Sequence, residues 1–275
     1  MNYDLHPHLA RLLRPALVCA LILALVASPA CRSCRSNPTP KQAEIPNLPF
    51  GNPSGAGSDP DNRLVLRPQF AASWNQSQRI ANWVAWRLVA GDIGETERSQ
   101  FYTDSEIPTP TPKDYTNSGY DRGHLCPSKD RSDTPENNQA VFTMLNIFPQ
   151  APDNNRGPWE KLERFERALA EAGREVYVIT GGAGSRGKIA GHINVPATTW
   201  KIIVALEPGR SYPDGQEKAM VFAVALPNEN GIRERRWQDF QTTAPEIERL
   251  TGCRFFSLAP IIALRAQEKR FEAAD

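Results

Sequence analysis

The sequence predicts an α+β domain, and its second half carries most of that prediction. Three continuous apolar runs, at 176–180, 200–206 and 220–226, have the length and composition of strands in a largely buried sheet. Before them, residues 158–172 place apolar side chains at helical spacing until Gly173. Together with β-rich runs earlier in the chain, these segments put strands on both sides of a helical middle region, which favours the α+β class.

The other elements follow in chain order within one domain, since 275 residues with 40% hydrophobic content suffice for one sizeable core. The runs at 64–70 and 83–89 are β-rich in character, and the polar, proline-containing stretch 91–119 is expected to be a surface loop. Residues 135–142 begin with the cap, proline and acid of a short helix. A last amphipathic piece, 244–250, predicts another helix.

The first 30 residues have the layout of an export signal. Arg11 and Arg14 precede an apolar run at 16–26, and small residues follow it. The run is too short for a comfortable membrane span, so we expect cleavage and a secreted or periplasmic protein. Cys31 comes directly afterwards, where a bacterial lipoprotein carries its acylated cysteine, so a lipid anchor at this residue is left open.

Residues 31–62 are crowded with proline and glycine and show no apolar periodicity, which is typical of a linker. The sequence therefore predicts a signal peptide over 1–30, a linker over 31–62 and the domain over 63–275.

The net charge of +1 excludes a strongly basic footprint in the composition as a whole, so any basic groove has to be local. Composition alone leaves an enzyme, a binding module and a cell-surface protein open.

Two cysteines, Cys126 and Cys253, fall in the expected domain. In an exported protein they can pair as a disulfide, or they can be two separately buried thiols, and the sequence does not choose between these states. No spacing of cysteine and histidine indicates a zinc site.

The histidines narrow the search for a base, because only His124 and His192 lie outside the expected signal peptide. Arg122 stands two residues before His124, so the two side chains share one face if the segment is extended. A guanidinium matches the oxygens of a phosphate, and a neutral imidazole can take a proton from an attacking water. This pairing predicts phosphodiester chemistry.

Taken one at a time, the candidate residues also have ordinary structural explanations. Arg122 can pair with Asp121, and Glu163 with Arg167 four residues later is the spacing of a solvated ion pair on a helix. Asn155 precedes Arg-Gly-Pro, which is good turn or cap chemistry before a helix. His192 is more simply structural, and the glycine-rich stretch 181–187 lacks the residues of a phosphate loop.

The residues in combination resemble the DNA/RNA non-specific endonucleases, a family that includes secreted bacterial nucleases and mitochondrial endonuclease G. The matching pieces stand in the family's order and spacing, and they are Asp121-Arg122-Gly123-His124-Leu125, Pro127-Ser128, Asp130-Arg131, Asn146, Pro149-Gln150, Asn155, Trp159, Glu163 and Arg167. The resemblance implies a ββα-metal (His-Me finger) nuclease with a central, mostly antiparallel sheet flanked by helices. It covers roughly the whole region after the linker.

The resemblance also implies a role for each matching residue. It makes His124 the general base and Asn155 the direct protein ligand of one Mg²⁺, with Mn²⁺ as a substitute. The other expected site residues are Arg122 and Arg167 on phosphate, Glu163 on metal-bound water, Asn146 near the catalytic histidine, and Arg98 as an upstream substrate-binding arginine. DNA and RNA are the expected partners, and a homodimer is left open.

Elementary chemistry is compatible with these roles. Magnesium keeps several waters and is often bound by one or two protein oxygens, so one amide oxygen need not be an incomplete site. Recognition through phosphates gives little sequence preference. Two alternatives stay open at this point, a phosphodiesterase of small nucleotides and a catalytically silent, nucleic-acid-binding surface lipoprotein.

Overall fold

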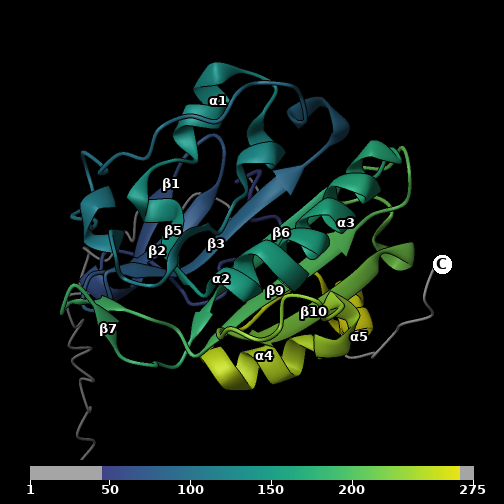
Figure 1. Ribbon diagram of the computed structural model, residues 1–275. Coiled ribbons are helices and arrows are strands. Elements are labelled where there is room, and N and C mark those ends of the chain that lie inside the picture. The colour runs from purple at the N-terminus through teal and green to yellow at the C-terminus, as the bar shows by residue number, and fades with distance from the viewer. Residues whose placement is uncertain (1–44, 267–275) are drawn as a thin grey trace, which may run out of the picture. The chain divides into compact units, whose positions relative to one another are not determined.

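The computed structural model describes residues 45–266, so the expected signal peptide, Cys31 and the first part of the linker lie outside the described residues. A six-stranded sheet runs through the centre in the order β1-β2-β3-β6-β9-β10 (Figure 1). All neighbouring strands pair antiparallel. The strands are β1 (Arg63–Leu66), β2 (Ala71–Asn75), β3 (Ile80–Leu88), β6 (Val176–Ala183), β9 (Thr198–Ala205) and β10 (Met220–Pro227). The predicted α+β class with a mostly antiparallel central sheet is confirmed.

The apolar runs form strands because both faces of the sheet are buried. In β9, Trp200, Ile202 and Val204 belong to the core on one face, while Ile203 belongs to the core on the other. Alternate side chains of a strand point to opposite faces, so a strand covered on both sides is a continuous apolar run. The charged exception in β9 is Lys201, which is completely buried.

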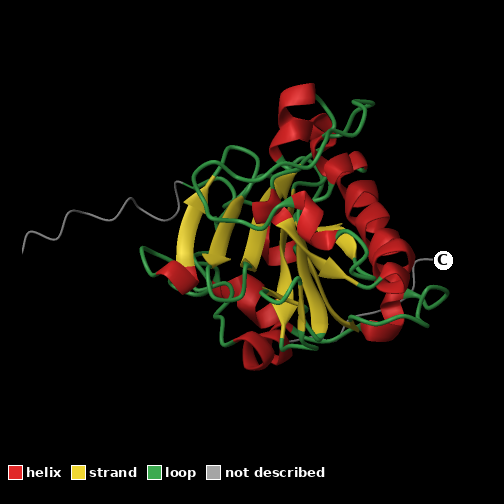
Figure 2. Ribbon diagram, turned by 60° about the vertical axis from the view of Figure 1, so that its left-hand side comes forward, coloured by secondary structure: helices red, strands yellow, loops and turns green. Residues whose placement is uncertain are grey.

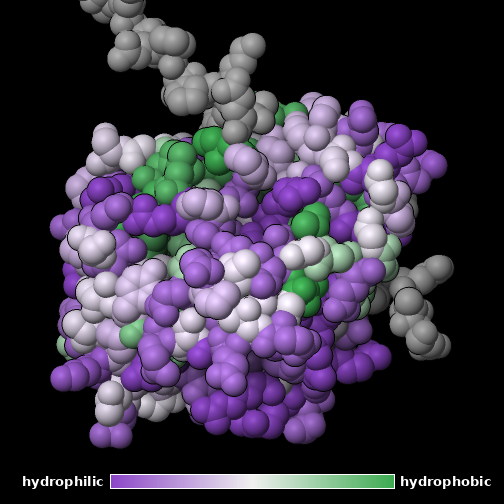
Figure 3. All heavy atoms as spheres, turned by 90° about the horizontal axis from the view of Figure 1, so that it is seen from above, coloured by the Kyte–Doolittle hydropathy of each residue, from purple (hydrophilic) through white to green (hydrophobic). Residues whose placement is uncertain are grey.

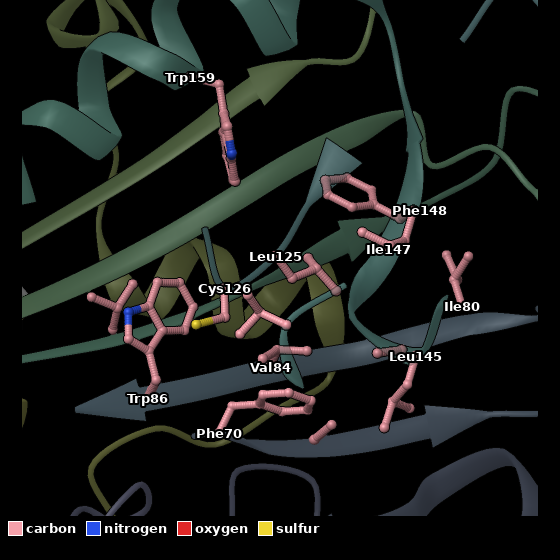
Figure 4. Packing of buried hydrophobic residues seen from close by; sticks show 14 of the residues in the cluster. Phe70, Ile80, Val84, Trp86, Leu125, Cys126, Leu145, Ile147, Phe148 and Trp159 are labelled. Carbon is pink, nitrogen blue, oxygen red and sulfur yellow. The ribbon is translucent and has the colours of Figure 1, made fainter. Parts of the chain in front are cut away.

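One face of the sheet carries α3 (Glu160–Glu171) and a small hairpin, β4 (Asp121–His124) paired with β5 (Ile147–Gln150). Trp86, Leu125, Phe148 and Trp159 pack in the core on this face (Figure 4). The shorter elements of the region are η3 (Ala90–Asp92), η4 (Pro112–Tyr115), η5 (Ser128–Arg131), α1 (Pro135–Ala140), η6 (Met144–Asn146), α2 (Pro152–Asn154) and η7 (Asn155–Trp159). Figure 2 shows the helices lying on both sides of the strands.

The opposite face is covered by α4 (Ala244–Thr251) and α5 (Pro260–Ala266), and by residues 45–62. The sequence assigned these last residues to the linker, but Leu48 is buried and Phe50 packs edge-on against Tyr177 at 5.1 Å. Ser54 Oγ also accepts a hydrogen bond of 2.8 Å from Trp83 Nε1. The domain therefore starts upstream of the boundary predicted at residue 63, because apolar side chains set among the prolines and glycines find partners on the sheet.

Two elements differ in detail from the sequence prediction. The first β-rich run, expected at 64–70, is broken after Leu66, where Arg67 N donates to Phe70 O across a tight turn containing Pro68. The helix expected from Pro158 begins only at Glu160, because Pro158 lies within η7, a wide π-type turn.

The remaining elements of the described chain are a small hairpin and three short turns. They are β7 (Lys188–Ile189) paired with β8 (Ile193–Asn194), and η2 (Pro60–Asn62), η8 (Gln216–Lys218) and η9 (Trp237–Phe240).

Cys126 and Cys253 are both free and buried, and they belong to the cores on opposite faces of the sheet. The alternative of two separate buried thiols therefore holds in this structure. None of the helices described over residues 45–266 has the length and apolar character that a membrane span requires.

The surface of the domain is mostly hydrophilic over the face with α1, with small apolar patches (Figure 3). Within residues 45–266, the large apolar side chains that are exposed are Leu66, Tyr102, Leu250 and Leu258, which come from separate elements. Single exposed apolar residues are normal and need no binding function.

Candidate active site

A pocket of about 360 Å³ opens where the β4–β5 hairpin meets the start of α3. Six residues singled out from the sequence line it, namely Arg98, Arg122, His124, Asn155, Glu163 and Arg167. The lining also includes Lys129, Arg156 and Glu160, which the sequence analysis missed. With five cationic and two acidic side chains, the pocket is a local basic site in a chain of nearly zero net charge.

Strand β4 presents Arg122 and His124 to the pocket together, because alternate residues of a strand share a face. Between them, Gly123 turns to the other side. A Cβ atom at Gly123 would stand 2.3 Å from Gln150 Oε1 on the paired strand, so a larger residue would force the hairpin apart. The glycine therefore lets β5 approach closely enough to hold both functional side chains in place.

His124 sits at the back of the pocket and is only 8% exposed. Its ring lies 4.8 Å from that of Phe142 and 5.3 Å from that of Phe101. Burial lowers the pKa of His124 to about 3, and the positive charge of Arg98 acts in the same direction. The imidazole is therefore neutral at pH 7. Its Nε2 atom is buried and has no hydrogen-bond partner within residues 45–266.

Asn146, which was expected near the catalytic histidine, is fully buried and does not line the pocket. Its Oδ1 accepts a hydrogen bond from Cys126 N, and its Nδ2 donates to Cys126 O and Val141 O, all at 2.8 or 2.9 Å. Its backbone carbonyl also accepts from Leu125 N. Asn146 therefore fixes the two residues that follow His124, and its side chain is used up in doing so.

Asn155 is oriented by Asp121, a residue of the matching segment to which the sequence analysis gave no role beyond pairing with Arg122. Asn155 Nδ2 donates to Asp121 Oδ2 at 2.8 Å, and Arg156 pairs with the same carboxylate. The amide nitrogen is thus occupied, whereas Oδ1 makes no hydrogen bond with the described residues. The position of Asp121 in the Asp-Arg-Gly-His segment was the available signal, since it lies on the same strand as Arg122 and His124.

Three arginines are held at the pocket by contacts that leave part of each guanidinium facing it. Arg122 donates to Pro112 O at 2.7 and 3.0 Å and lies over the Phe101 ring. Arg167 donates to Asp130 Oδ1 at 3.1 Å. Arg98 is exposed and lies 5.3 Å from the centre of the Phe142 ring.

Glu163 does not pair with Arg167 in the structure, so the solvated ion pair that the spacing allowed is not formed. Burial raises the pKa of Glu163 to about 7, and the nearby Lys201 acts against that shift. Lys201 itself contacts both carboxylate oxygens of Glu166 at 3.0 and 3.1 Å, with both side chains completely buried. The buried charges that act on Glu163 thus come from residues far apart in the chain.

The donor set fits a hard cation such as magnesium. Asn155 Oδ1 and the Glu163 carboxylate both line the pocket, and both are oxygen ligands without a protein partner in the described chain. Residues 45–266 hold no group of three or more His, Cys, Asp or Glu residues suited to a metal, so a closed all-protein cage is not formed there. A neutral base, phosphate-matching arginines and an oxygen-only cation site are the parts of a metal-dependent phosphodiester hydrolase.

Comparison with known proteins agrees with that class. The family model described as DNA/RNA non-specific endonuclease matches residues 52–260. The chain is 40% identical over 253 residues to a nuclease of Nostoc sp., covering 84% of this chain and 92% of the relative. It is 30% identical over 238 residues to nuclease C1 of Cunninghamella echinulata, covering 79% and 90%.

A chain in the solved structure of the EndoG/EndoGI complex has the same fold, with a TM-score of 0.65 and 22% identity over 78% of this chain and 90% of that one. The protein belongs to the DNA/RNA non-specific endonuclease family. It is therefore a nuclease that hydrolyses phosphodiester bonds, from a family that in general depends on a metal.

Proposed function

We propose that this nuclease cleaves DNA and RNA with little sequence preference, in a reaction that requires Mg²⁺ and uses His124 as general base. The observation that carries the proposal is the shared pocket, where His124 from β4 and Asn155 from η7 are joined by Arg122, Arg167 and Glu163. A base, a cation ligand and phosphate-binding groups within one pocket are what hydrolysis of a phosphodiester needs.

The base would act through Nδ1 of His124. The other ring nitrogen, Nε2, is buried, so Nδ1 is the nitrogen that can meet a water in the pocket. The lowered pKa keeps the ring unprotonated at neutral pH. A bound phosphate would offset the charge of Arg98 and the other arginines, which would raise the pKa of His124 toward the range of an effective base.

The arginines would bind and orient the substrate. Arg122 and Arg167 are fixed by Pro112 O and Asp130, so their remaining N–H groups are positioned before a phosphate arrives. Arg98 also lines the pocket and would contribute a further charge, and its role as a substrate-binding residue stays a prediction.

Asn155 and Glu163 would hold a hydrated Mg²⁺, Asn155 through Oδ1 and Glu163 through water. When bound, the ion supplies positive charge that stabilises the pentacovalent phosphorane and the leaving oxygen. Asp121 keeps the Asn155 oxygen available by engaging the amide nitrogen. Because these groups address phosphate rather than base edges, sequence preference would be low.

Plasmid nicking tests the proposal. Wild-type full-length protein should nick and linearise plasmid with Mg²⁺ and should be inactive in EDTA. His124→Ala should lose about 10²- to 10⁴-fold in rate, the usual contribution of a general base. The matched control is His192→Ala, since His192 is half-buried, does not line the pocket and is bonded to the carbonyl oxygen of Ala190. Equal activity of the His124 variant and its control would refute the base assignment.

The sequence of residues 1–30 supports a further proposal, that the nuclease is exported and that the signal is removed. N-terminal sequencing of the protein recovered from the periplasm or medium should begin close to residue 31. Full-length protein confined to the cytoplasm would contradict export, and a lipid on Cys31, detected by mass spectrometry, would identify the anchored form. A homodimer stays a prediction.

A further inference from the structure

A second basic feature lies beside the pocket, in the loop of residues 231–237, which we call the arginine loop. Its side chains Arg233, Arg235 and Arg236 are 44%, 55% and 73% exposed. The loop is anchored at both ends, because Ile232 and Trp237 are buried in the domain. Three guanidinium groups are therefore displayed from a fixed backbone.

The arginine loop packs directly on the segment that carries Asn155. A Cβ atom at Gly157 would stand 2.6 to 3.0 Å from backbone atoms of Arg233, so η7 and the loop are in close contact. Asp153 in α2 accepts hydrogen bonds from Gly231 N and Arg233 Nε, at 2.8 and 2.9 Å. The loop is thereby tied to the residues on either side of Asn155.

A third connection runs from α3. Lys161 Nζ donates to Arg233 O and Arg235 O at 3.4 Å, and its neighbour Glu160 lines the pocket. The exposed Arg156, next to Asn155, also lines the pocket. The arginine loop is therefore joined both to α3 and to the segment that carries Asn155, and residues of both line the pocket.

The arginines of the loop are balanced only by ion pairs at the surface of the domain. Arg235 and Arg236 pair with the same carboxylate, Asp239, at 3.0 and 3.3 Å. Glu234 is the acidic residue within the loop. Exposed ion pairs of this kind are weak, so a phosphate can displace them at little cost. The loop residues alone carry three arginines and one acid, a net charge of +2, and Asp153 and Asp239 offset that charge only through such pairs.

We propose that the arginine loop binds backbone phosphates that flank the scissile bond of a polynucleotide. This inference rests on the proposed function and sharpens it, because it makes the substrate a strand long enough to reach from the pocket to the loop. A small phosphodiester would occupy the pocket alone and gain nothing from the loop.

The test compares two double variants of the full chain that remove equal charge. One is Arg235→Ala with Arg236→Ala, and the control is Arg249→Ala with Arg254→Ala. Arg249 lies on α4 and Arg254 just after it, with the elements that cover the opposite face of the sheet. Binding of a labelled DNA duplex is measured by fluorescence anisotropy in EDTA, which prevents cleavage, over a range of salt concentrations.

The loop variant should bind the duplex about tenfold more weakly at about 0.1 M salt, and its plot of log Kd against log salt should lose about 2 in slope, one for each phosphate contact removed. The control should stay within about twofold of the wild type. In cleavage, the ratio of kcat/KM for the duplex to kcat/KM for bis(4-nitrophenyl) phosphate should fall about tenfold for the loop variant alone.

The outcomes separate the two proposals. If the wild type cuts DNA but the loop variant matches the control in slope and in the cleavage ratio, the arginine loop does not bind substrate. A loop variant that is weaker on both substrates by the same factor would also overturn the inference, since that is the signature of a disturbed pocket. If no variant cuts any phosphodiester while the slope difference persists, the proposed function fails, and what remains of the inference is a loop that binds the phosphate backbone.

Discussion

The interiors on the two faces of the central sheet are both apolar but differ in how much charge they bury. Beneath α3, the interior holds buried charge, with Asp130, Arg131, Glu166 and Lys201 all less than 5% exposed. Beneath α4 and α5, the interior is mainly aromatic and aliphatic, with side chains such as Trp83, Trp200, Phe255 and Phe256. The buried acid on that side, Glu175, lies against Arg87 and Tyr177.

The difference shows on which face of the sheet several charged side chains are buried although removing them from water is unfavourable. A buried ion pair gains little stability over apolar packing, because both partners lose their hydration. On the catalytic side, the buried charges touch the site, since Asp130 holds Arg167 and Lys201 acts on the pKa of Glu163. The interior beneath α4 and α5 does not support the site in this way, so it contributes to stability alone.

The largest effect of this difference between the two faces is expected at Lys201. Replacing it by methionine should leave Glu166 buried without its partner and should destabilise the domain by about 3 to 5 kcal/mol in urea unfolding. The double variant Lys201→Met with Glu166→Met should recover most of that loss, because an apolar pair of similar volume needs no hydration. If single and double variants were equally unstable, the loss would come from packing against Trp86 and Trp159 instead of from the charge.

A smaller effect is expected from the protonation of Glu163. Because its pKa is raised to about 7 in the folded protein, the folded state binds the proton more tightly than the unfolded chain does. The contribution of Glu163 to stability in EDTA should therefore be fully present below the ordinary glutamate pKa and should be lost as pH rises toward and past 7.

The expected fall is about 2 kcal/mol, and Glu163→Gln should remove it because glutamine does not titrate. Thermal unfolding of both proteins across this pH range measures the difference. Parallel curves for the variant and the wild type would show that Glu163 is not the titrating group.

The smallest effect belongs to the apolar face. Ser54→Ala removes the acceptor of the Trp83 indole N–H and should cost about 1 to 2 kcal/mol of unfolding free energy. Plasmid nicking by this variant should match the wild type, because Ser54 lies on the face away from the pocket. A loss of nicking without a loss of stability would contradict the division of labour between the two faces.

The sequence predicted the long strands and α3 well, because their apolar patterns are properties of neighbouring residues. Site residues such as His124, Arg122 and Asn155 were found from motif and resemblance, and all three line the pocket. The direction in which Asn146 turns could not be predicted, because it depends on Cys126 and Val141 folding back around it.

Residues 45–62 were misjudged for a related reason. Their prolines and glycines give no periodicity, and the partners of Phe50 are rings at Tyr177, Tyr212 and Phe256, far along the chain. The ion pair of the buried Lys201 could not be predicted for the same reason, since nothing near Lys201 in the sequence identifies Glu166 as its counterion. Local pattern predicts elements, whereas these contacts exist only once the elements are packed.

The packing of residues 45–62 also bears on how the enzyme can be attached to something else. Pro53 O accepts a hydrogen bond from Arg254 N, and Phe50 O accepts one from Leu258 N. These bonds join the segment to residues near the end of the domain, on the face of the sheet covered by α4 and α5. A bead, a resin or a fused protein joined upstream of residue 45 would therefore be attached on the face of the sheet opposite the pocket. Long polymers would still have free access to the pocket.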